Sequence, residues 1–307
     1  MSLHRLTTIT IGVPDPDATA DYYRDFGLTD LGGNRFGTVD GGEQLRIART
    51  PQRRLLELGI GAHDPEDLAR IAAQLDKLAI AHTADDRSLT VQDPNSSLTV
   101  NVEIAPEIQQ QPASSPVTNG PGRHDRRDQR AAVISRTEPV RPRKLGHVVI
   151  GSLDQEASQR FFAEGLGFKV SDSVPGLAAF MRCSTDHHNV LVQQAPLNFL
   201  HHTAWEVDDV DEVGRGATAM LEDNPDRHVW GLGRHHIGSN FFWYLKDPAG
   251  NFSEYYSDLD CVVDDALWKP EVVEGIKGLY NWGPPPPPSF LAPEDLAALM
   301  TGSHAPH

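Results

Sequence analysis

The stretch KLGHVVIGSLDQEASQRFFAEGLGF, residues 144–168, decides the fold, because it resembles a second stretch of the same chain. That second stretch is RLTTITIGVPDPDATADYYRDFGL, residues 5–28. Each has the pattern of a strand, a glycine, an acidic start to a helix, a pair of aromatic residues and a closing glycine. Similarity at a fixed spacing within one chain is the signature of a repeated architecture.

Two further matches extend the repeat. LELGIGAHDPEDLARIAAQL (56–75) aligns with HHTAWEVDDVDEVGRGATAM (201–220), and VQDPNSSLTV (91–100) aligns with YLKDPAGNFSE (244–254) through the Asp-Pro turns. Each half of the chain therefore alternates short strands with helices, which indicates two similar domains of mixed α and β structure.

Composition divides the chain into an N-terminal domain (1–105), a linker (106–143), a C-terminal domain (144–260) and a tail (261–307). The linker is rich in Pro, Ser, Gln and Arg, with little apolar periodicity, which indicates a long surface connection. The tail contains the run Pro284–Pro288, which we interpret as a stiff polyproline II spacer before a short helix near 293–300. The alternative for this run is a ligand for a proline-recognition domain.

Charge and cysteine content limit the classes of binding partner and the expected compartment. The formal net charge of −16 argues against non-specific binding to nucleic acid and against adhesion to anionic membranes. No apolar run approaches the roughly 20 residues that span a bilayer, and the N-terminus lacks the layout of a signal peptide. Cys183 and Cys261 are too few for a disulfide framework. We expect a cytoplasmic protein with reduced thiols, in a setting compatible with a ferrous ion.

The repeat alignment shows that the two halves differ at three positions. Thr8, Glu57 and Val100 of the first half face His147, His202 and Glu254 of the second. Two histidines and a glutamate form a metal-ligand set, whereas the first-half residues do not. The sequence therefore predicts a metal site in the second half only.

Strand alternation supports the same site. Alternate side chains of a strand share a face, and one face of each second-half strand is apolar and suited to packing against helices. The other face carries His147, His202, Tyr244 and Glu254, which a curved sheet could gather into one concave pocket. Two imidazoles and one carboxylate with open positions are favoured by non-haem Fe(II) oxygenases. Zinc and manganese also suit these ligands.

The stretch GRHHIGSNFFWYLKDPAGNFSE, residues 233–254, resembles the ring-cleavage signature of the type I extradiol dioxygenases of the vicinal oxygen chelate superfamily. That signature runs from Gly-x-His through an apolar-Tyr pair and an Asp-Pro-x-Gly turn to a Glu. Trp243 departs from it where an aliphatic residue or Phe is usual, and we expect an effect on packing only. RCSTDHHNVLV (182–192) resembles the family's strand with a catalytic His, and FLHHTAWEV (199–207) resembles its second metal-ligand strand.

The resemblance implies an α+β fold with two vicinal-oxygen-chelate domains. Each would consist of paired βαβββ repeats that form a curved sheet around a cavity, with the helices outside. The implied metal ligands are His147, His202 and Glu254, holding Fe(II), with Mn(II) as the alternative.

The implied catalytic residues are His188, His235 and Tyr244. His188 would take a proton from the substrate and return it, while the other two would donate hydrogen bonds. His187 and His201 would point away as packing residues, and His236 has no counterpart.

The implied function is extradiol cleavage of a catechol by O2, next to the diol, to a hydroxymuconic semialdehyde-type product in aromatic-compound degradation. Expected partners are a catecholic substrate, O2 and further copies of the chain in a homo-oligomer, with no nucleic acid and no membrane. A metal-dependent glyoxalase-like isomerase or epimerase is the second interpretation, and a non-catalytic binding protein is the third. His188, His235 and Tyr244, together with the absence of ligands in the first half, favour oxygenation. Monocyclic, biphenyl-type and fused-ring catechols all remain open as substrates.

Overall fold

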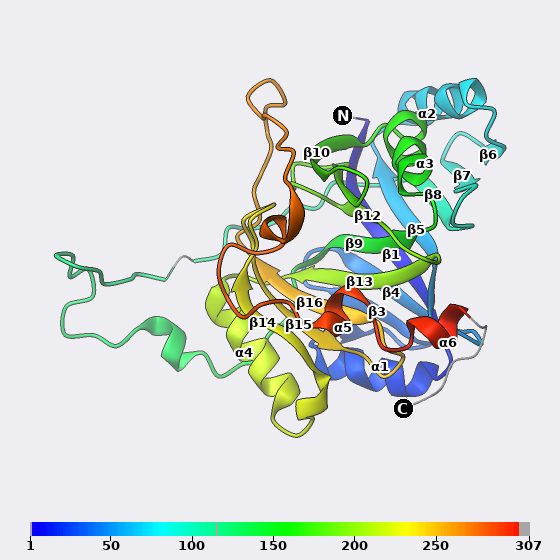
Figure 1. Cartoon of the computed structure of the whole chain (residues 1–307). Helices are drawn as coiled ribbons and strands as arrows, with labels where there is room; N and C mark the ends of the chain where they lie inside the picture. The colour runs from blue at the N-terminus through cyan, green and yellow to red at the C-terminus, as the bar shows by residue number, and fades with distance from the viewer. Residues whose placement is uncertain (1, 115, 301–307) are drawn as a thin grey trace.

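Two curved eight-stranded sheets, one from each half of the chain, form the body of the molecule (Figure 1). This computed structural model describes residues 2–114 and 116–300. Within those ranges, no helix has both the length and the apolar character needed to cross a membrane.

The elements of the first half form one continuous series along the chain. They are β1 (Leu3–Val13), α1 (Pro16–Asp25), β2 (Thr29–Asp30), β3 (Arg35–Thr38), β4 (Gly42–Arg49), β5 (Arg54–Ala62), α2 (Pro65–Lys77), β6 (His82–Ala84), β7 (Ser88–Gln92) and β8 (Thr99–Ile104).

The second half repeats this series. It contains β9 (Lys144–Ser152), α3 (Gln155–Arg160), β10 (Lys169–Val174), β11 (Ala178–Arg182), β12 (Val190–Gln194), β13 (Phe199–Glu206), α4 (Val210–Leu221), β14 (His228–Arg234), β15 (Phe241–Lys246) and β16 (Phe252–Ser257). A short π-helical segment at Phe161–Gly165 extends α3.

The strand order shows how the repeats join. It is β2-β3-β4-β1-β5-β8-β7-β6 in the first sheet and β10-β11-β12-β9-β13-β16-β15-β14 in the second. Each sheet is therefore two βαβββ units, joined through the antiparallel pairing of their first strands, β1 with β5 and β9 with β13. The expected fold class is confirmed.

The four principal helices begin in the same way. An aspartate at each N-cap accepts a backbone hydrogen bond from the first turn, and these residues are Asp15, Asp64, Asp154 and Asp209. A side-chain acceptor at this position satisfies an otherwise unpaired N–H and is worth about 1 kcal/mol. The cap is thus a local signal that marks the start of the helix in every βαβββ unit.

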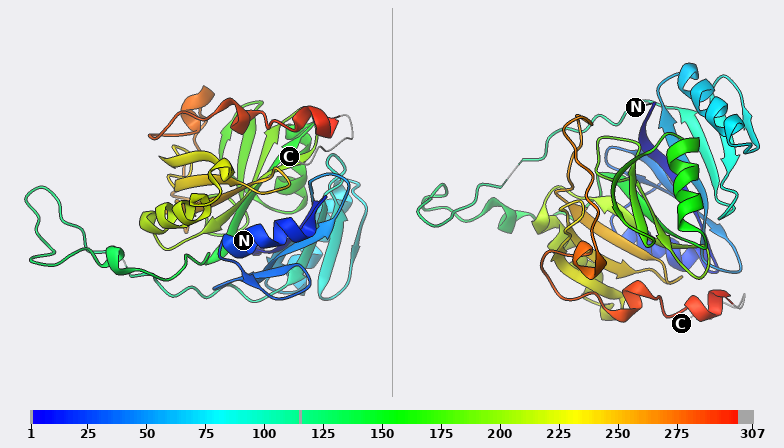
Figure 2. Two further views of the ribbon diagram at one scale, coloured as in Figure 1. Left: turned by 90° about the horizontal axis from the view of Figure 1, so that it is seen from below. Right: turned by 45° about the horizontal axis from the view of Figure 1, so that its top comes forward.

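The helices lie on the sheet faces away from the cavity, and α1 also packs against the other half of the chain (Figure 1). Figure 2 shows α1 between the two sheets. Phe26, next to α1, stacks on Tyr255 of β16 with ring centroids 3.9 Å apart, and the Tyr255 hydroxyl donates to the Phe26 carbonyl at 2.7 Å. Both residues belong to one large apolar cluster that spans both halves, so the halves share a core.

The pairing of β8 corrects one position of the repeat alignment. Tyr244 pairs with Glu254 in the second half, and Thr90, the counterpart of Tyr244, pairs with Asn101 in the first. The counterpart of Glu254 is therefore Asn101 and not Val100. The alignment was wrong by one position because the Asp-Pro turn of the first half contains one more residue, with Ser97 at a φ of 58°.

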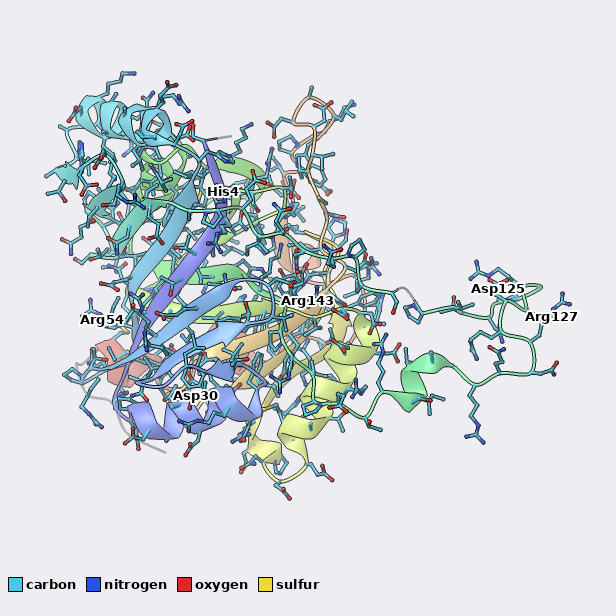
Figure 3. The ribbon with its side chains drawn as sticks, turned by 180° about the vertical axis from the view of Figure 1, so that it is seen from behind. His4, Asp30, Arg54, Asp125, Arg127 and Arg143 are labelled. Atoms are coloured by element: carbon cyan, nitrogen blue, oxygen red, sulfur yellow. The ribbon has the colours of Figure 1, made fainter. Side chains whose placement is uncertain are left out.

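The segment between the sheets leaves the body as a long arm, with one short 3₁₀ helix at Ala132–Ser135 (Figure 1). Figure 3 shows Asp125 and Arg127 at its far end, and Arg143 back against the body. Arg143 forms an ion pair with Asp40 at 2.7 Å, which ties the end of the arm to the first sheet.

The short helix expected near 293–300 is present at Leu296–Met300, and the proline run before it is held against the second sheet. The tail lies along the second sheet and carries the short helices α5 (Pro288–Leu291) and α6 (Leu296–Met300). Trp230 donates from Nε1 to the Pro284 carbonyl at 2.7 Å, and Phe290 is buried. The proline run is held by a tertiary contact that no local pattern indicates.

Candidate metal centre

The three predicted ligands stand on adjacent strands in the middle of the second sheet. Ala204 of β13 pairs with His147 of β9 on one side and with Glu254 of β16 on the other. His202 lies two residues before Ala204 and therefore points to the same face. The Nε2 atoms of His147 and His202 lie 3.2 and 3.5 Å from Glu254 Oε2.

This ligand set fits a divalent metal. All three side chains are buried, and their ligand atoms lie within 4.8 Å of one another. Glu254 Oε1 accepts from Asn240 Nδ2 at 3.0 Å, but Oε2 has no hydrogen-bond partner among the described residues. A buried carboxylate oxygen without a partner is costly, and a cation would stabilise it. Burial also lowers the pKa of His202 well below its ordinary value, which keeps the imidazole neutral, as a metal ligand must be.

His201, the neighbour of His202, determines which ring nitrogen of His202 carries the proton. His201 Nε2 lies 2.6 Å from the Phe290 carbonyl oxygen, which can only accept, so this nitrogen carries the proton. Burial lowers the pKa of His201 to about 4, so the ring is neutral and its Nδ1 is an acceptor. The 2.7 Å contact between the two Nδ1 atoms is then a donation from His202, whose Nε2 lone pair points toward Glu254. Metal-binding histidines commonly donate their other N–H in this way.

The predicted catalytic residues surround the same cavity. The His188 ring lies in the segment before β12, with its centroid 4.2 Å from that of His147. Burial, reinforced by the neighbouring histidines, lowers the pKa of His188 well below its ordinary value. A neutral imidazole therefore faces the cavity, and a neutral imidazole can accept a proton.

His235 and Tyr244 form a hydrogen-bonded pair. His235 Nδ1 donates to the Leu279 carbonyl, so its Nε2 accepts from the Tyr244 hydroxyl at 2.9 Å when the ring is neutral. Burial lowers the pKa of His235 and raises that of Tyr244, which favours this arrangement of protons. His235 can donate toward the cavity only after it receives a second proton, which is a condition on the donor role expected for it.

Aromatic residues near the site fall into two groups. Phe180 lines the cavity, whereas Trp230 and Phe242 pack together with Tyr244 and Phe290 in a cluster of their own. Phe290 belongs to both groups. It lines the cavity, and its ring lies 4.7 Å from that of Tyr244, measured between centroids. The tail therefore supplies one wall of the site.

Sequence reasoning missed several of these contributions. Asn240, just before β15, donates to Glu254, a contact that only the fold shows. Leu279 and Phe290 act through backbone carbonyls, which no residue type reveals. His187 and His201 contact Asp172 and the Phe290 carbonyl through Nε2, and each is hydrogen-bonded through Nδ1 to the histidine that follows it.

Comparison with known proteins agrees with this geometry. Residues 144–255 match the family model of the Glyoxalase/Bleomycin resistance protein/Dioxygenase superfamily. The chain belongs to this superfamily and, within it, to the extradiol dioxygenases. It is 30% identical over 303 residues to metapyrocatechase 2 of Cupriavidus necator, covering 94% of this chain and 92% of that protein. It is 29% identical over 157 residues to the manganese-dependent 2,3-dihydroxybiphenyl 1,2-dioxygenase of Geobacillus genomosp. 3, covering 47% of this chain and 50% of that one.

Solved structures share the fold. The Mn(II)-bound glyoxalase of Novosphingobium aromaticivorans superposes with a TM-score of 0.74 at 22% identity, over 100% of this chain and 95% of that chain. The E323L mutant of homoprotocatechuate 2,3-dioxygenase from Brevibacterium fuscum has a TM-score of 0.74 at 19% identity, over 94% of this chain and 81% of that chain. At these identities the likeness concerns the two-domain architecture.

Proposed function

We propose that the protein is an extradiol dioxygenase that opens the ring of a catechol with O2, at the bond next to the diol. The observation that carries the proposal is the convergence of His147, His202 and Glu254 beside a buried cavity. Such a set with open positions is typical of non-haem Fe(II) oxygenases. Similarity to metapyrocatechase 2 over nearly the whole chain supports the same activity.

Fe(II) is the proposed resident metal, and Mn(II) is the second choice. Two neutral imidazoles and one carboxylate leave one net positive charge on a divalent ion, which suits a catechol bound as a monoanion. The metal would hold both catechol oxygens next to O2 and let electron density pass from the ring to O2. The manganese-dependent relative supports Mn(II) as the alternative.

The protein's own residues would manage the protons. His188 accepts the proton that the catechol loses on binding. Later in the reaction it returns this proton to an oxygen atom that comes from O2. His235 and Tyr244 line the same cavity, and His235, once it has received a second proton, can donate to oxygen on which negative charge develops. Both atoms of O2 remain in a hydroxymuconic semialdehyde-type product, so the reaction needs no separate reductant.

The cavity lining points to a catechol that carries no charged substituent. Beyond the metal-site and catalytic side chains it is mainly apolar, with Val149, Phe180, Leu191, Ile237 and Phe290. No lysine or arginine lines it among the described residues. A carboxylate substituent would lose its water there without gaining a cationic partner, which is costly. We therefore propose catechols with no substituent or an apolar one.

The test begins with the full chain reconstituted with Fe(II) under argon and analysed for iron. Catechol, 3-methylcatechol, 2,3-dihydroxybiphenyl and homoprotocatechuate are then added in air while O2 uptake and yellow colour are recorded. Uptake and colour are expected with the uncharged catechols, and kcat/KM for homoprotocatechuate should be at least about 10-fold lower. Iron-loaded protein that consumes no O2 with any catechol would overturn the proposal in favour of the isomerase class.

Assembly and compartment are also proposals. We infer a homo-oligomer, which light scattering at several concentrations tests, because a monomer throughout would contradict it. We infer the cytoplasm from the sequence, and the thiols of Cys183 and Cys261 are both free. Fractionation of the native host tests this inference.

A further inference from the structure

A series of buried, hydrogen-bonded side chains lies behind His188. Asp172 of β10 and His187 are both buried, with exposed fractions of 4% and 0%. His187 Nε2 lies 2.9 Å from Asp172 Oδ2, and His187 Nδ1 lies 3.0 Å from His188 Nδ1. Buried polar side chains are costly unless they are hydrogen-bonded, and the proposed reaction gives neither Asp172 nor His187 a role.

The chemistry of the partners fixes the direction of these hydrogen bonds. Asp172 as a carboxylate has no proton to donate, and its Oδ1 already accepts from the backbone N–H of Glu271 at 2.6 Å. His187 Nε2 is therefore the donor to Oδ2. A neutral His187 then has a lone pair on Nδ1, so the proton between the two rings belongs to His188 Nδ1.

We propose that Asp172 and His187 are positioning residues that hold His188 in the tautomer whose Nε2 lone pair faces the cavity. The inference deepens the proposed function and rests on it for the role of His188. A neutral imidazole without a partner can carry its proton on either nitrogen. In the other tautomer, an Nε2–H would face the substrate, and the ring could not accept the catechol proton.

The second histidine pair supports the assignment. His201 and His202 repeat the contact between consecutive Nδ1 atoms, at 2.7 Å. There the terminal acceptor is the Phe290 carbonyl oxygen, so the direction follows without any assumption about a carboxylate. The first histidine of each pair thus turns the Nε2 lone pair of the second toward the cavity.

The decisive measurement reads the tautomer itself. Full-length protein labelled with ¹⁵N at histidine and loaded with diamagnetic Zn(II) gives separate signals for protonated and unprotonated ring nitrogens. Wild type is expected to show His188 protonated at Nδ1 and bare at Nε2. In Asp172→Asn the new amide can donate to His187 Nε2, so the proton of each ring should move to the other nitrogen. A wild-type His188 protonated at Nε2 would overturn the proposal, whatever the activity.

Kinetics provide the functional readout. Asp172→Asn keeps the shape and the Oδ1 acceptor, so iron content and KM should remain within about twofold while kcat falls roughly 10²–10⁴-fold. Asp172→Glu, which restores a carboxylate, should recover part of that kcat. His236→Gln, at a half-exposed histidine beside Glu271, is the matched control and should leave kcat unchanged.

The outcomes separate the two proposals. Unchanged kcat in Asp172→Asn, in an enzyme whose wild type cleaves catechols, would overturn the positioning role. A wild type that cleaves no catechol would overturn the proposed function. The nitrogen signals would still support or reject the tautomer assignment in that case.

Discussion

Arg53 holds Asp295 through two hydrogen bonds, from Nε at 2.6 Å and from Nη2 at 2.9 Å. Arg53 belongs to the first half of the chain, and Asp295 lies in the tail that covers the site of the second half. The guanidinium is fully buried and also donates from Nη1 to the Leu200 carbonyl at 2.6 Å and to Asn251 Oδ1 at 3.2 Å. One side chain therefore joins the first half, the second sheet and the tail.

Asp295→Asn should loosen the tail. The change leaves the Arg53 charge buried without its anion, and breaking one side of a buried ion pair costs about 3 kcal/mol. Urea unfolding should show this loss, and limited proteolysis should cut the tail faster. Glu294→Gln is the control, because Glu294 is exposed and lies 3.7 Å from an exposed Lys246, so its effect should stay within about 0.5 kcal/mol. Equal proteolysis of the two variants would contradict the role of Arg53.

Glu254→Gln should abolish stoichiometric iron binding, because the carboxylate oxygen without a partner is the anionic ligand. The metal-free variant should be at least as stable as metal-free wild type, since a neutral amide replaces a buried charge. Metal analysis and thermal unfolding of the metal-free forms measure both effects. Glu57→Gln, in the first sheet, should bind iron as wild type does. Full iron occupancy in Glu254→Gln would remove this residue from the ligand set.

Tyr244→Phe should lower kcat by roughly 10–10³-fold with iron retained, because it removes the hydroxyl that shares a proton with His235. Tyr255→Phe is the matched control. It removes a buried hydrogen bond to the Phe26 carbonyl, which should cost about 1–3 kcal/mol of stability without changing kcat. Equal kcat losses in the two variants would point to a general structural effect.

Stability should depend on pH through Asp247. Burial raises the pKa of its carboxyl to about 6 from the ordinary 3.8. Hydrogen bonds from Asn251 and Ala249 and the charge of Arg53 act to lower this pKa, but burial has the larger effect. The folded state therefore binds this proton more tightly than the unfolded chain. Its contribution is complete below about pH 4 and is lost as the pH rises through 6, a change of about 3 kcal/mol. Asp247→Asn stays neutral, so its stability relative to wild type should rise by that amount between about pH 4 and pH 7. Parallel curves for the two proteins would contradict this pKa.

Much of the fold was predictable because its signals are local and occur repeatedly along the chain. An aspartate N-cap starts each of the four helices, and strand alternation alone is enough to place His147, His202 and Glu254 on one face. The one register error came from a single extra residue in a turn. A gapless alignment through Asp93 and Asp247 cannot detect such an insertion, whereas strand pairing does.

The remaining part of the site was not predictable because it depends on backbone atoms and on residues distant in sequence. His201 finds its acceptor 89 residues away in the tail. Asp172 lies on the edge strand β10, and its contact with His187, 15 residues away, follows from the tertiary fold. The composition of the tail suggested a spacer, and only the contacts of Trp230 and Arg53 show that it closes the site.

The extra residue in the first-half turn determines how a second metal centre could be engineered into this chain. Val100 is fully buried in the core, so a glutamate placed there by sequence alignment would carry its charge among apolar side chains. Asn101 is only partly buried, and it pairs across the sheet with Thr90 as Glu254 does with Tyr244. An engineer who wished to install the triad in the first sheet would therefore change Thr8, Glu57 and Asn101 and leave Val100 alone.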